Sequence, residues 1–375
     1  MTVLYLSYDG LTDPLGQSQI LPYLRGLSAF GHDITVVSFE KPLTFSVAEK
    51  YIREQCLKAG LTWKPLVYHK SPPVFSTFFD LLTLSRKAGT LHKKKNFQIV
   101  HCRSYITSLV GARLQRTKGI RFIFDMRGFW ADERIEGGLW NKRNPLLNSI
   151  YSFFKAKERD FIRSADYIIS LTQNGRAEIT KWGAPPDKTE VIPTCVDLDL
   201  FNHDSIDADH RAVVCERLGL ASGEFILTYL GSLGTWYMMA EMIAFFDVLK
   251  KYRSSAKFLV ISQDAWTFGK RADIVTVHVS RQDVPLYLSL ASAAVFFIRP
   301  TFSKKASSAT KTGELLAMGL PVVCNSGWGD IDEMKGKETG ITVIDDFTTV
   351  AYERAAIRLL ACEFDRTRLR QSPDL

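Results

Sequence analysis

Short apolar segments of strand length recur along the chain and alternate with segments of helical periodicity. Strands that alternate with helices form parallel sheets, and short continuous apolar strands indicate that helices cover both faces. The expected strands are Val3–Leu6, Ile34–Ser38, Phe97–His101, Phe122–Phe124, Tyr167–Leu171, Phe225–Leu230, Phe258–Ile261, Val275–Val277, Ala294–Ile298 and Pro321–Cys324. Helical periodicity marks Gln19–Phe30, Phe79–Lys94, Asn148–Arg163, Met238–Arg253 and Lys311–Met318. The sequence therefore predicts an α/β protein of doubly wound type.

The alternation is interrupted between about Pro193 and Glu224, where the chain becomes polar and acidic. A chain of 375 residues also exceeds what one hydrophobic core commonly serves. We therefore expect two Rossmann-like domains, residues 1–195 and residues 196–375. Ligands of such sheets bind at the carboxyl ends of the strands, and a cleft between two domains is a natural site.

Composition and charge narrow the functional classes. Hydrophobic residues make up 46% and charged residues 23%, as in ordinary globular enzymes. The net charge of +8 is uneven: residues 1–195 hold 28 Lys and Arg against 17 Asp and Glu, whereas the remainder holds 20 against 23. The basic half indicates an anionic partner. Nucleic acid, an anionic lipid surface and a phosphorylated substrate all satisfy this, although no nucleic-acid-binding motif is present.

The sequence also gives expectations about the cellular location of the protein, contact with a membrane and metal binding. No apolar run approaches the roughly 20 residues of a spanning helix, and no secretory signal is apparent, so we expect a cytoplasmic protein, with the inner face of the cell membrane as a further option. The stretch Val74–Lys95 joins aromatics to a run of cations. It is either an interfacial helix on an anionic membrane or a core-packing helix with a solvated basic end. The six cysteines are scattered without zinc-ligand spacing, and no carboxylate cluster suggests a metal.

Polar residues follow three strands of the first half. Gly16 and Gln17 lie where a helix begins after the first strand, and backbone amides there could bind a phosphate or a sugar oxygen of the acceptor; an ordinary tight strand-to-helix turn is the alternative. The dinucleotide fingerprint is absent there, which disfavours a nicotinamide dehydrogenase. Two later strands end in charged or polar residues that suit acceptor recognition and proton transfer, namely His101, Arg103, Asp125 and Arg127. A buried histidine without a functional role is the alternative for His101.

The second half carries two loops suited to a diphosphate. Glycines after its first strand allow close approach of the backbone to phosphate. A later Ser/Thr-rich loop opens a helix that carries a lysine and a glutamate, which suits a pyrophosphate and a ribose. An ordinary turn and a plain capped helix are the alternatives. The candidate donor-binding residues are Gly231, Ser232, Gly234, Arg299, Ser307, Ser308, Thr310, Lys311 and Glu314.

Three stretches, DPLGQSQILPYLRGL, TEVIPTCVDLDLF and TKTGELLAMGLPVV, resemble the retaining nucleotide-sugar glycosyltransferases of family 4. The resemblance covers nearly the whole chain. It implies a GT-B fold, in which two Rossmann-like domains face each other across a cleft, with the acceptor on the first domain and the donor on the second. It further implies a nucleoside-diphosphate sugar as co-substrate, a UDP-sugar being commonest, with no other cofactor and no metal.

The same resemblance implies the acceptor class and the chemistry. The acceptor would be a glycan or a lipid-linked hydroxyl, as in the biosynthesis of cell-surface polysaccharide or lipopolysaccharide. Glu314 would bind the ribose, Lys311 would neutralise the leaving diphosphate, and Asp125 would orient the acceptor. These three residues are the predicted catalytic set.

The chain departs from the family pattern in its charged residues. Ala306 stands where the first acidic residue of the family's pair would be, and Ser232 and Tyr237 fall near positions of two cations. Two other functions remain open: a sugar-nucleotide epimerase of the same fold and a non-enzymatic ligand-binding protein. The cations that could replace the missing pair are Lys311, Lys304, Lys305, Arg299 and Arg127.

Overall fold

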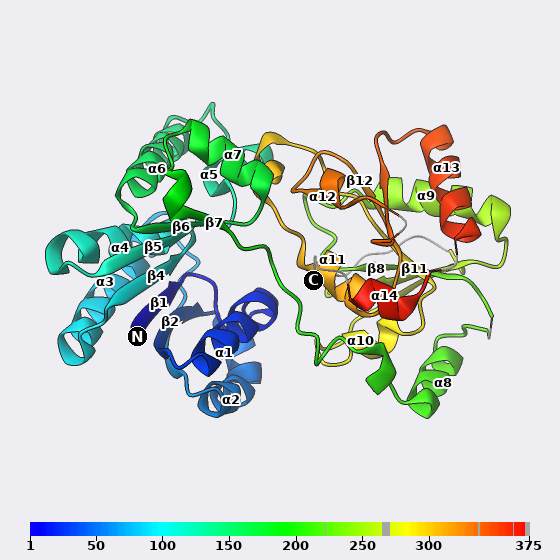
Figure 1. Ribbon diagram of the computed structural model, residues 1–375, viewed down its shortest axis with the longest axis horizontal. Helices are drawn as coiled ribbons and strands as arrows, with labels where there is room; N and C mark the ends of the chain where they lie inside the picture. The colour runs from blue at the N-terminus through cyan, green and yellow to red at the C-terminus, as the bar shows by residue number, and fades with distance from the viewer. Residues whose placement is uncertain (222, 265–270, 337, 363, 372–375) are drawn as a thin grey trace. The chain divides into compact units, whose positions relative to one another are not determined.

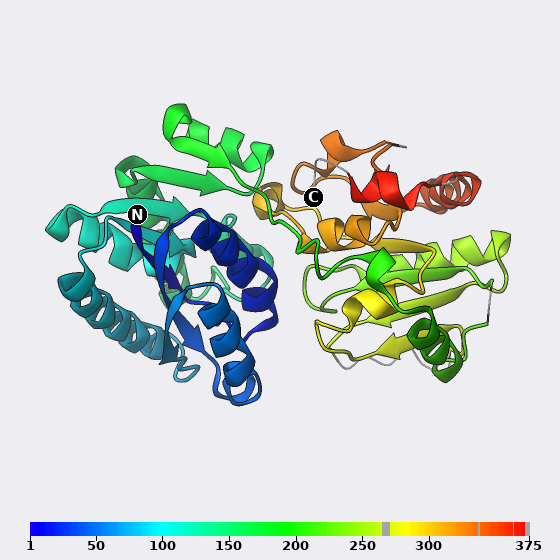
Figure 2. The ribbon, with the colours of Figure 1, turned by 60° about the horizontal axis from the view of Figure 1, so that its bottom comes forward.

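The computed structural model describes residues 1–371 except Ser222, residues 265–270, Lys337 and Glu363. By its internal contacts the chain divides into two compact units. The N-domain comprises Met1–Pro193 together with Lys305–Ser308, and the C-domain comprises Thr194–Lys304 and Ala309–Leu375. Figures 1 and 2 show that each domain is a sheet layered between helices.

The N-domain is built on a seven-stranded sheet of order β3-β2-β1-β4-β5-β6-β7, in which every pair is parallel. The central strands are almost wholly buried, which explains their continuous apolar character. The strands are β1 (Thr2–Ser7), β2 (Asp33–Glu40), β3 (Thr62–Val67), β4 (Ile99–Arg103), β5 (Arg121–Asp125), β6 (Tyr167–Ser170) and β7 (Thr189–Val191).

Helices cover both faces of this sheet and create two cores. One core joins β1 and β2 to the first helices, and the other joins β1, β4 and β5 to the later helices. Figure 1 shows α1 and α2 apart from α3, α4 and α6. The helical segments are η1 (Gly16–Ile20, a π-helical turn), α1 (Leu21–Ala29), α2 (Pro42–Lys58), α3 (Phe75–Lys95), α4 (Ser104–Lys118), α5 (Trp130–Glu136), α6 (Pro145–Ser164), α7 (Gln173–Lys181) and η2 (Pro186–Lys188).

The C-domain repeats the plan with a six-stranded parallel sheet of order β10-β9-β8-β11-β12-β13. Its strands are β8 (Ile226–Leu230), β9 (Lys257–Ile261), β10 (Ile274–Val277), β11 (Ala293–Phe296), β12 (Val322–Asn325) and β13 (Ile341–Ile344). Its helical segments are η3 (His203–Ser205), α8 (Ala208–Arg217), α9 (Met239–Tyr252), α10 (Val284–Leu288), α11 (Thr310–Ala317), α12 (Ile331–Met334), α13 (Thr349–Ala361) and α14 (Arg366–Arg370), and η4 (Phe302–Ala306) begins in this domain and ends in the N-domain.

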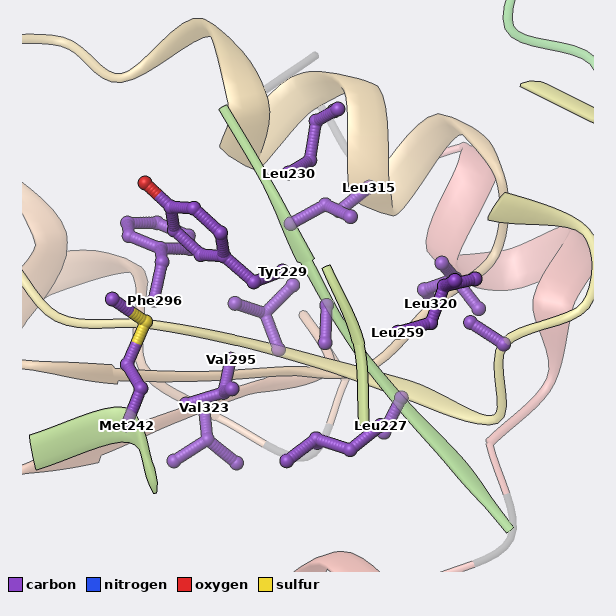
Figure 3. Close-up of a cluster of buried hydrophobic side chains, with 14 of the residues drawn as sticks. Leu227, Tyr229, Leu230, Met242, Leu259, Val295, Phe296, Leu315, Leu320 and Val323 are labelled. Atoms are coloured by element: carbon purple, nitrogen blue, oxygen red, sulfur yellow. The ribbon is translucent and has the colours of Figure 1, made fainter. Parts of the chain in front are cut away.

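The core of the C-domain forms around the central strands of this sheet. Figure 3 shows side chains of β8, β9, β11 and β12 packed with Leu315 of α11, and Tyr229 and Phe296 stand at one end of the cluster. Tyr229 lies near the end of β8 and Phe296 ends β11, so this end of the core borders the loops that follow the strands.

The predicted α/β fold class is confirmed, since both sheets are parallel and alternate with helices. All ten predicted strands are present, with ends shifted by about two residues. The prediction missed β3, β7 and β13. Each of these is an edge strand of its sheet, and β3 carries Lys64 and Pro65, which interrupt an apolar run.

The described residues contain no helix that is both long and apolar enough to cross a membrane.

Candidate functional site

Each sheet has one topological switch point, where ligands of open parallel sheets bind. In the N-domain it lies between β1 and β4, because the chain leaves β1 toward β2 and β3 and returns to β4. In the C-domain it lies between β8 and β11 for the same reason. The predicted site residues in the loops after these strands therefore fall at two definite places.

Strand register brings the charged residues of the N-domain together. Arg103 ends β4 and Asp125 ends β5, and these two residues are direct partners in the parallel ladder. The side chain of Arg103 is 4% exposed and that of Asp125 also 4%. Arg127 follows two residues after β5, and its Nη1 lies 3.8 Å from Oδ1 of Asp125. These residues, which the sequence placed at the ends of two strands, therefore lie at one edge of the sheet.

Asp125 is held between a histidine and the arginines. Nε2 of His101 lies 3.3 Å from Oδ2 of Asp125, and the His101 ring lies 4.7 Å from the Tyr5 ring between centroids, with the two planes tilted by 48°. Burial alone would raise the pKa of the Asp125 carboxyl, but the charge of Arg127, the hydrogen bond from His101 and the charge of Arg103 lower it below its ordinary value. Asp125 is therefore a buried carboxylate that fixes its cationic neighbours.

Gln19 of η1 joins the two arginines. Its Oε1 accepts a hydrogen bond from Nη2 of Arg103 at 2.6 Å and another from Nη2 of Arg127 at 2.8 Å. Arg103 also lies 3.4 Å from the half-exposed Asp9. Burial and the charge of Arg103 lower the pKa of the Arg127 guanidinium. Two cations thus converge on one neutral oxygen.

The loop after β1 is fixed by a buried carboxylate. Glu40 accepts hydrogen bonds from the backbone of Leu11 at 2.9 Å and of Thr12 at 3.0 Å. Gly16 packs so tightly that a methyl group there would lie 1.9 Å from the carbonyl oxygen of Gly10. Gln17 donates from Nε2 to the carbonyl oxygen of Thr12 at 3.0 Å. Gly16 and Gln17 therefore shape this loop, and the structure brings Gln19, rather than Gln17, to the arginines.

Lys311 of α11 is the central cation of the C-domain. Its ammonium lies 3.2 Å from the hydroxyl of Tyr229, 3.5 Å from the ring centre of Tyr237 and 5.5 Å from that of Phe296. Within the described part of the chain it forms no ion pair. Burial lowers its pKa well below the ordinary value, and only Glu314 opposes this. A buried ammonium in such surroundings is suited to an anionic ligand.

Glu314, one turn further along α11, is held by Arg281. Nη1 of Arg281 lies 2.9 Å from Oε1 of Glu314, and both side chains are largely buried. The Arg281 guanidinium lies 5.1 Å from the ring centre of Phe201, and its Nη2 is buried without a hydrogen-bond partner. One oxygen of Glu314 and one nitrogen of Arg281 are thereby oriented as a pair.

The glycine-rich loop after β8 lies directly beside Lys311. Gly231 has a φ of +128°, and a methyl group there would lie 2.6 Å from Nζ of Lys311. The carbonyl oxygen of Ser232 accepts from the hydroxyl of Tyr229. Gly234 has open space around its α-carbon. The backbone of this loop can therefore approach a ligand that the ammonium binds.

The other predicted donor residues lie at different places. Arg299 donates to the carbonyl oxygen of Thr235 at 2.5 Å and lies over the ring of Trp236, which Lys304 also covers at 3.9 Å. Thr310 begins α11 and so belongs with Lys311. The side chains of Arg299 and Lys304 thus pack against the loop that follows Gly234.

Residues 305–308 belong to the N-domain by contact, although the sequence analysis assigned them to the second domain. The carbonyl oxygen of Lys305 accepts from Thr172 at 2.7 Å, and Ser307 lies 3.4 Å from Glu133. Ala306 is buried, and its Cβ is 3.0 Å from where a methyl group at Gly175 would lie. Ser307 and Ser308 therefore belong to the N-domain by contact, and Ala306 occupies a buried packing position.

The described residues contain no group of three or more His, Cys, Asp or Glu side chains arranged to hold a metal ion.

Sequence reasoning missed Gln19, Glu40, Tyr229 and Arg281, which are polar residues inside predicted strands, helices or loops without a motif. For Arg281 the only available signal was its place just after a predicted strand.

Comparisons with known proteins define the class. Residues 19–200 match the model of the family described as Glycosyltransferase Family 4. HepE from Anabaena, solved with UDP and glucose, superposes with a TM-score of 0.66 at 12% identity and covers 99% of this chain and 92% of that chain. Sucrose-phosphate synthase from Thermosynechococcus elongatus gives 0.67 at 15% identity, with 99% and 91% covered.

WaaG, a glycosyltransferase involved in lipopolysaccharide biosynthesis, gives a TM-score of 0.63 at 15% identity and covers 99% of this chain and 92% of that chain. No curated protein sequence matches significantly. The matched structures show a fold of two Rossmann-like domains, and the family match supports a glycosyltransferase. Residues 19–200 match the family 4 model, in agreement with the resemblance that the sequence motifs indicated.

Proposed function

We propose that this glycosyltransferase moves a sugar from a nucleoside-diphosphate sugar, with uridine as the expected base, to a hydroxyl group of a glycan or lipid-linked acceptor. The transfer retains the anomeric configuration and needs no metal ion. A role in assembling cell-surface polysaccharide or lipopolysaccharide fits this chemistry. HepE was solved with UDP-sugar components, and WaaG acts in lipopolysaccharide biosynthesis, which supports both the donor and the role.

One observation carries the proposal: the buried ammonium of Lys311 lies against the glycine loop at the C-domain switch point, without an anionic partner among the described residues. Cleavage of the donor develops negative charge on the diphosphate, and a fixed cation stabilises that charge in the transition state. Lys311 lies over Tyr237, the residue near one of the family's usual cationic positions. We assign to Lys311 the role of that missing cation.

Other residues of the C-domain would bind the rest of the donor. Gly231 lies beside Lys311, and the backbone of the loop that continues through Ser232 and Gly234 suits phosphate oxygens. Glu314, held by Arg281, has a second carboxylate oxygen for the ribose hydroxyls. The departing phosphate can take the acceptor proton in a front-side route, so Asp125 orients acceptor-binding cations instead of acting as nucleophile.

The test is a titration of UDP, GDP and ADP into the full chain, followed by nucleotide-release assays with the matching donors. Tight binding of one nucleoside diphosphate, with release that depends on an added acceptor, is expected for the transferase. Conversion of the donor without any acceptor would instead identify an epimerase. Failure of every nucleotide to bind would refute the proposal.

A contact with an anionic membrane would present a lipid-linked acceptor to the N-domain. At the start of α3, Phe75, Phe78 and Phe79 are 74%, 61% and 53% exposed. Asp80 accepts from the hydroxyl of Tyr8 at 2.9 Å, so this turn lies beside the carboxyl end of β1. Apolar side chains exposed at that edge, on a basic domain, suit an interfacial role.

Sedimentation with anionic vesicles checks this contact. The triple change Phe75→Ser, Phe78→Ser and Phe79→Ser should release the protein from the vesicles. Phe30→Ser removes a ring that is more exposed than any of these three, at 83%, where α1 ends, and should leave sedimentation unchanged. Equal sedimentation of the triple variant and the parent would count against this patch.

A further inference from the structure

We propose that Arg103 and Arg127 together bind a phosphate group of the acceptor, which displaces the side-chain oxygen of Gln19. This inference rests on the proposed transferase function and names the chemical class of its acceptor: a hydroxyl compound that carries a phosphate. The same site would take the phosphate of a soluble sugar phosphate or of a lipid headgroup.

The geometry of the guanidinium pair is the first argument. Nη2 of Arg103 and Nη2 of Arg127 lie 2.6 Å and 2.8 Å from the same Oε1 of Gln19. Two like charges are thereby held within reach of a single neutral atom. A phosphate oxygen at that position would accept the same two hydrogen bonds and would also neutralise the charge, so it binds more strongly than the amide does.

Charge balance is the second argument. Among the described residues, Asp125 is the carboxylate buried within this cluster, and its Oδ2 is directed to His101. Its Oδ1 lies 3.8 Å from Arg127, beyond hydrogen-bond distance. Asp9 is 51% exposed, so water screens most of its charge. Nε of Arg127 is buried without a partner. The cluster therefore keeps an excess of positive charge and an unused donor.

The place in the fold is the third argument. Arg103 ends β4, beside the N-domain switch point, and α4 starts at the next residue, so its positive dipole end points at the same place. Arg127 has a φ of 55°, an uncommon conformation for a residue with a side chain. Backbone strain of this kind persists where the surroundings hold a residue for a purpose.

Gln19 controls access to the pair. The Arg103 side chain is 4% exposed and that of Arg127 is 14% exposed, so neither is open to solvent by itself. Gln19 lies on η1 and is partly exposed. Rotation of its side chain would free the position at which Nη2 of both arginines now donates, so a phosphate oxygen could take that position without any change in the strands. Gln19 thus holds the two arginines in place until the phosphate arrives.

Titration of inorganic phosphate into the full chain by calorimetry tests the inference. It is performed in the Lys311→Met variant, which removes the cation of the proposed donor site. Arg127→Gln should weaken phosphate binding by about tenfold or more, the usual value of a charge-assisted hydrogen bond. Arg113→Gln changes an exposed arginine of α4 and should leave the affinity unchanged. Equal affinities of the Arg127→Gln variant and its parent would overturn the proposal.

A gain of binding separates this role from a structural one. Gln19→Ala removes the neutral oxygen that the phosphate must displace, so phosphate affinity should rise severalfold, while a merely damaged fold would lower it. A drop in affinity for Gln19→Ala would contradict the displacement. Nucleotide titrations in the same variants report the donor site separately, so loss of the donor function and loss of the phosphate site are distinguished.

Two further arms identify the source of the phosphate. In the first, glucose 6-phosphate replaces inorganic phosphate in the calorimetric titration. In the second, vesicles of phosphatidylcholine with phosphatidic acid are sedimented with the protein. A loss through Arg127→Gln in the first arm alone indicates a soluble acceptor, and a loss in the second indicates a lipid headgroup. Insensitivity of both arms to Arg127→Gln would again refute the site.

Discussion

At the switch point of the N-domain, two buried guanidinium groups share a neutral oxygen and lie close to a buried carboxylate. At the switch point of the C-domain, one buried ammonium is surrounded by aromatic rings and a phenol hydroxyl. Both places are positively charged, but the first contains a carboxylate paired with its cations, whereas Lys311 forms no ion pair among the described residues, since Glu314 pairs with Arg281. A buried cation without an anion destabilises the folded state, and an anionic ligand removes that cost.

Because the N-domain cations are paired with a carboxylate, whereas Lys311 forms no ion pair in the described chain, the two switch-point sites should differ in how they affect stability and binding. The N-domain cluster is held in position before any ligand binds, so its charged residues should contribute to stability. The Lys311 ammonium should lower stability and strengthen binding of a diphosphate. Mutations that remove charge should therefore have opposite effects on stability in the two domains.

The largest effect is expected for Asp125→Asn. Loss of the carboxylate leaves the buried cations of the N-domain without compensation and should lower the free energy of unfolding by about 3 kcal/mol or more. Urea denaturation at neutral pH measures it. Since the fold lowers the pKa of Asp125, its contribution is present above the ordinary value of 3.8 and is lost as pH falls through the lowered value. The difference between variant and parent should shrink in that direction; a difference that grows would contradict this picture.

Lys311→Met comes second and should separate stability from activity. Turnover should fall on the order of 10²-fold, as when a fixed donor to a developing anion is lost. The free energy of unfolding should rise by about 1 kcal/mol or more, because the variant buries no unpaired charge. Donor turnover and urea denaturation check the two effects. Lys335→Met, a change outside both sites, serves as a control; lower stability of Lys311→Met would break the comparison.

How much of the fold and of the candidate site the sequence predicts depends on the strength of the hydrophobic pattern at each element. Buried central strands and long amphipathic helices leave strong apolar patterns, so ten strands and the helix of Lys311 were predictable. Edge strands such as β3 and β7 contact fewer neighbours and admit polar residues, so their patterns were too weak. Positions at strand ends identified Arg103, Asp125 and Arg127, because parallel strands end at one edge.

The contacts between site residues could not be predicted in the same way. Gln19 lies inside a helical pattern and Arg281 in a loop, and nothing in their spacing indicates that they meet Arg103 or Glu314. Those side-chain contacts depend on the order of the strands in each sheet and on the direction in which each side chain points. Residues 305–308 show the same limit, since sequence adjacency to Lys311 predicted a shared site and the contacts assign them to the other domain.

Proton uptake sharpens the comparison further. Burial lowers the pKa of Lys311 in the free protein, and a bound diphosphate should raise it again. Nucleotide affinity should then fall by up to about tenfold per pH unit as pH rises from the lowered value toward the ordinary 10.5, with protons taken up on binding. Calorimetry in buffers of different ionisation enthalpy measures the uptake. The Lys311→Met variant should lose this dependence, and an unchanged profile there would assign it to another group.

The smallest effect is expected for Arg281→Gln, which tests whether the C-domain also contains an orienting pair. Arg281 holds Glu314 at 2.9 Å, and glutamine can still donate one hydrogen bond to that carboxylate. The ribose-binding oxygen would then be oriented less firmly, so nucleotide affinity should fall only severalfold, with KM raised and kcat nearly unchanged. Arg271→Gln, on an arginine that pairs with Asp247 and Asp273, is the matched control. A fall in kcat as large as that of Lys311→Met would mean that Arg281 acts on the diphosphate itself, and the C-domain would then contain two cations at its switch point, like the N-domain.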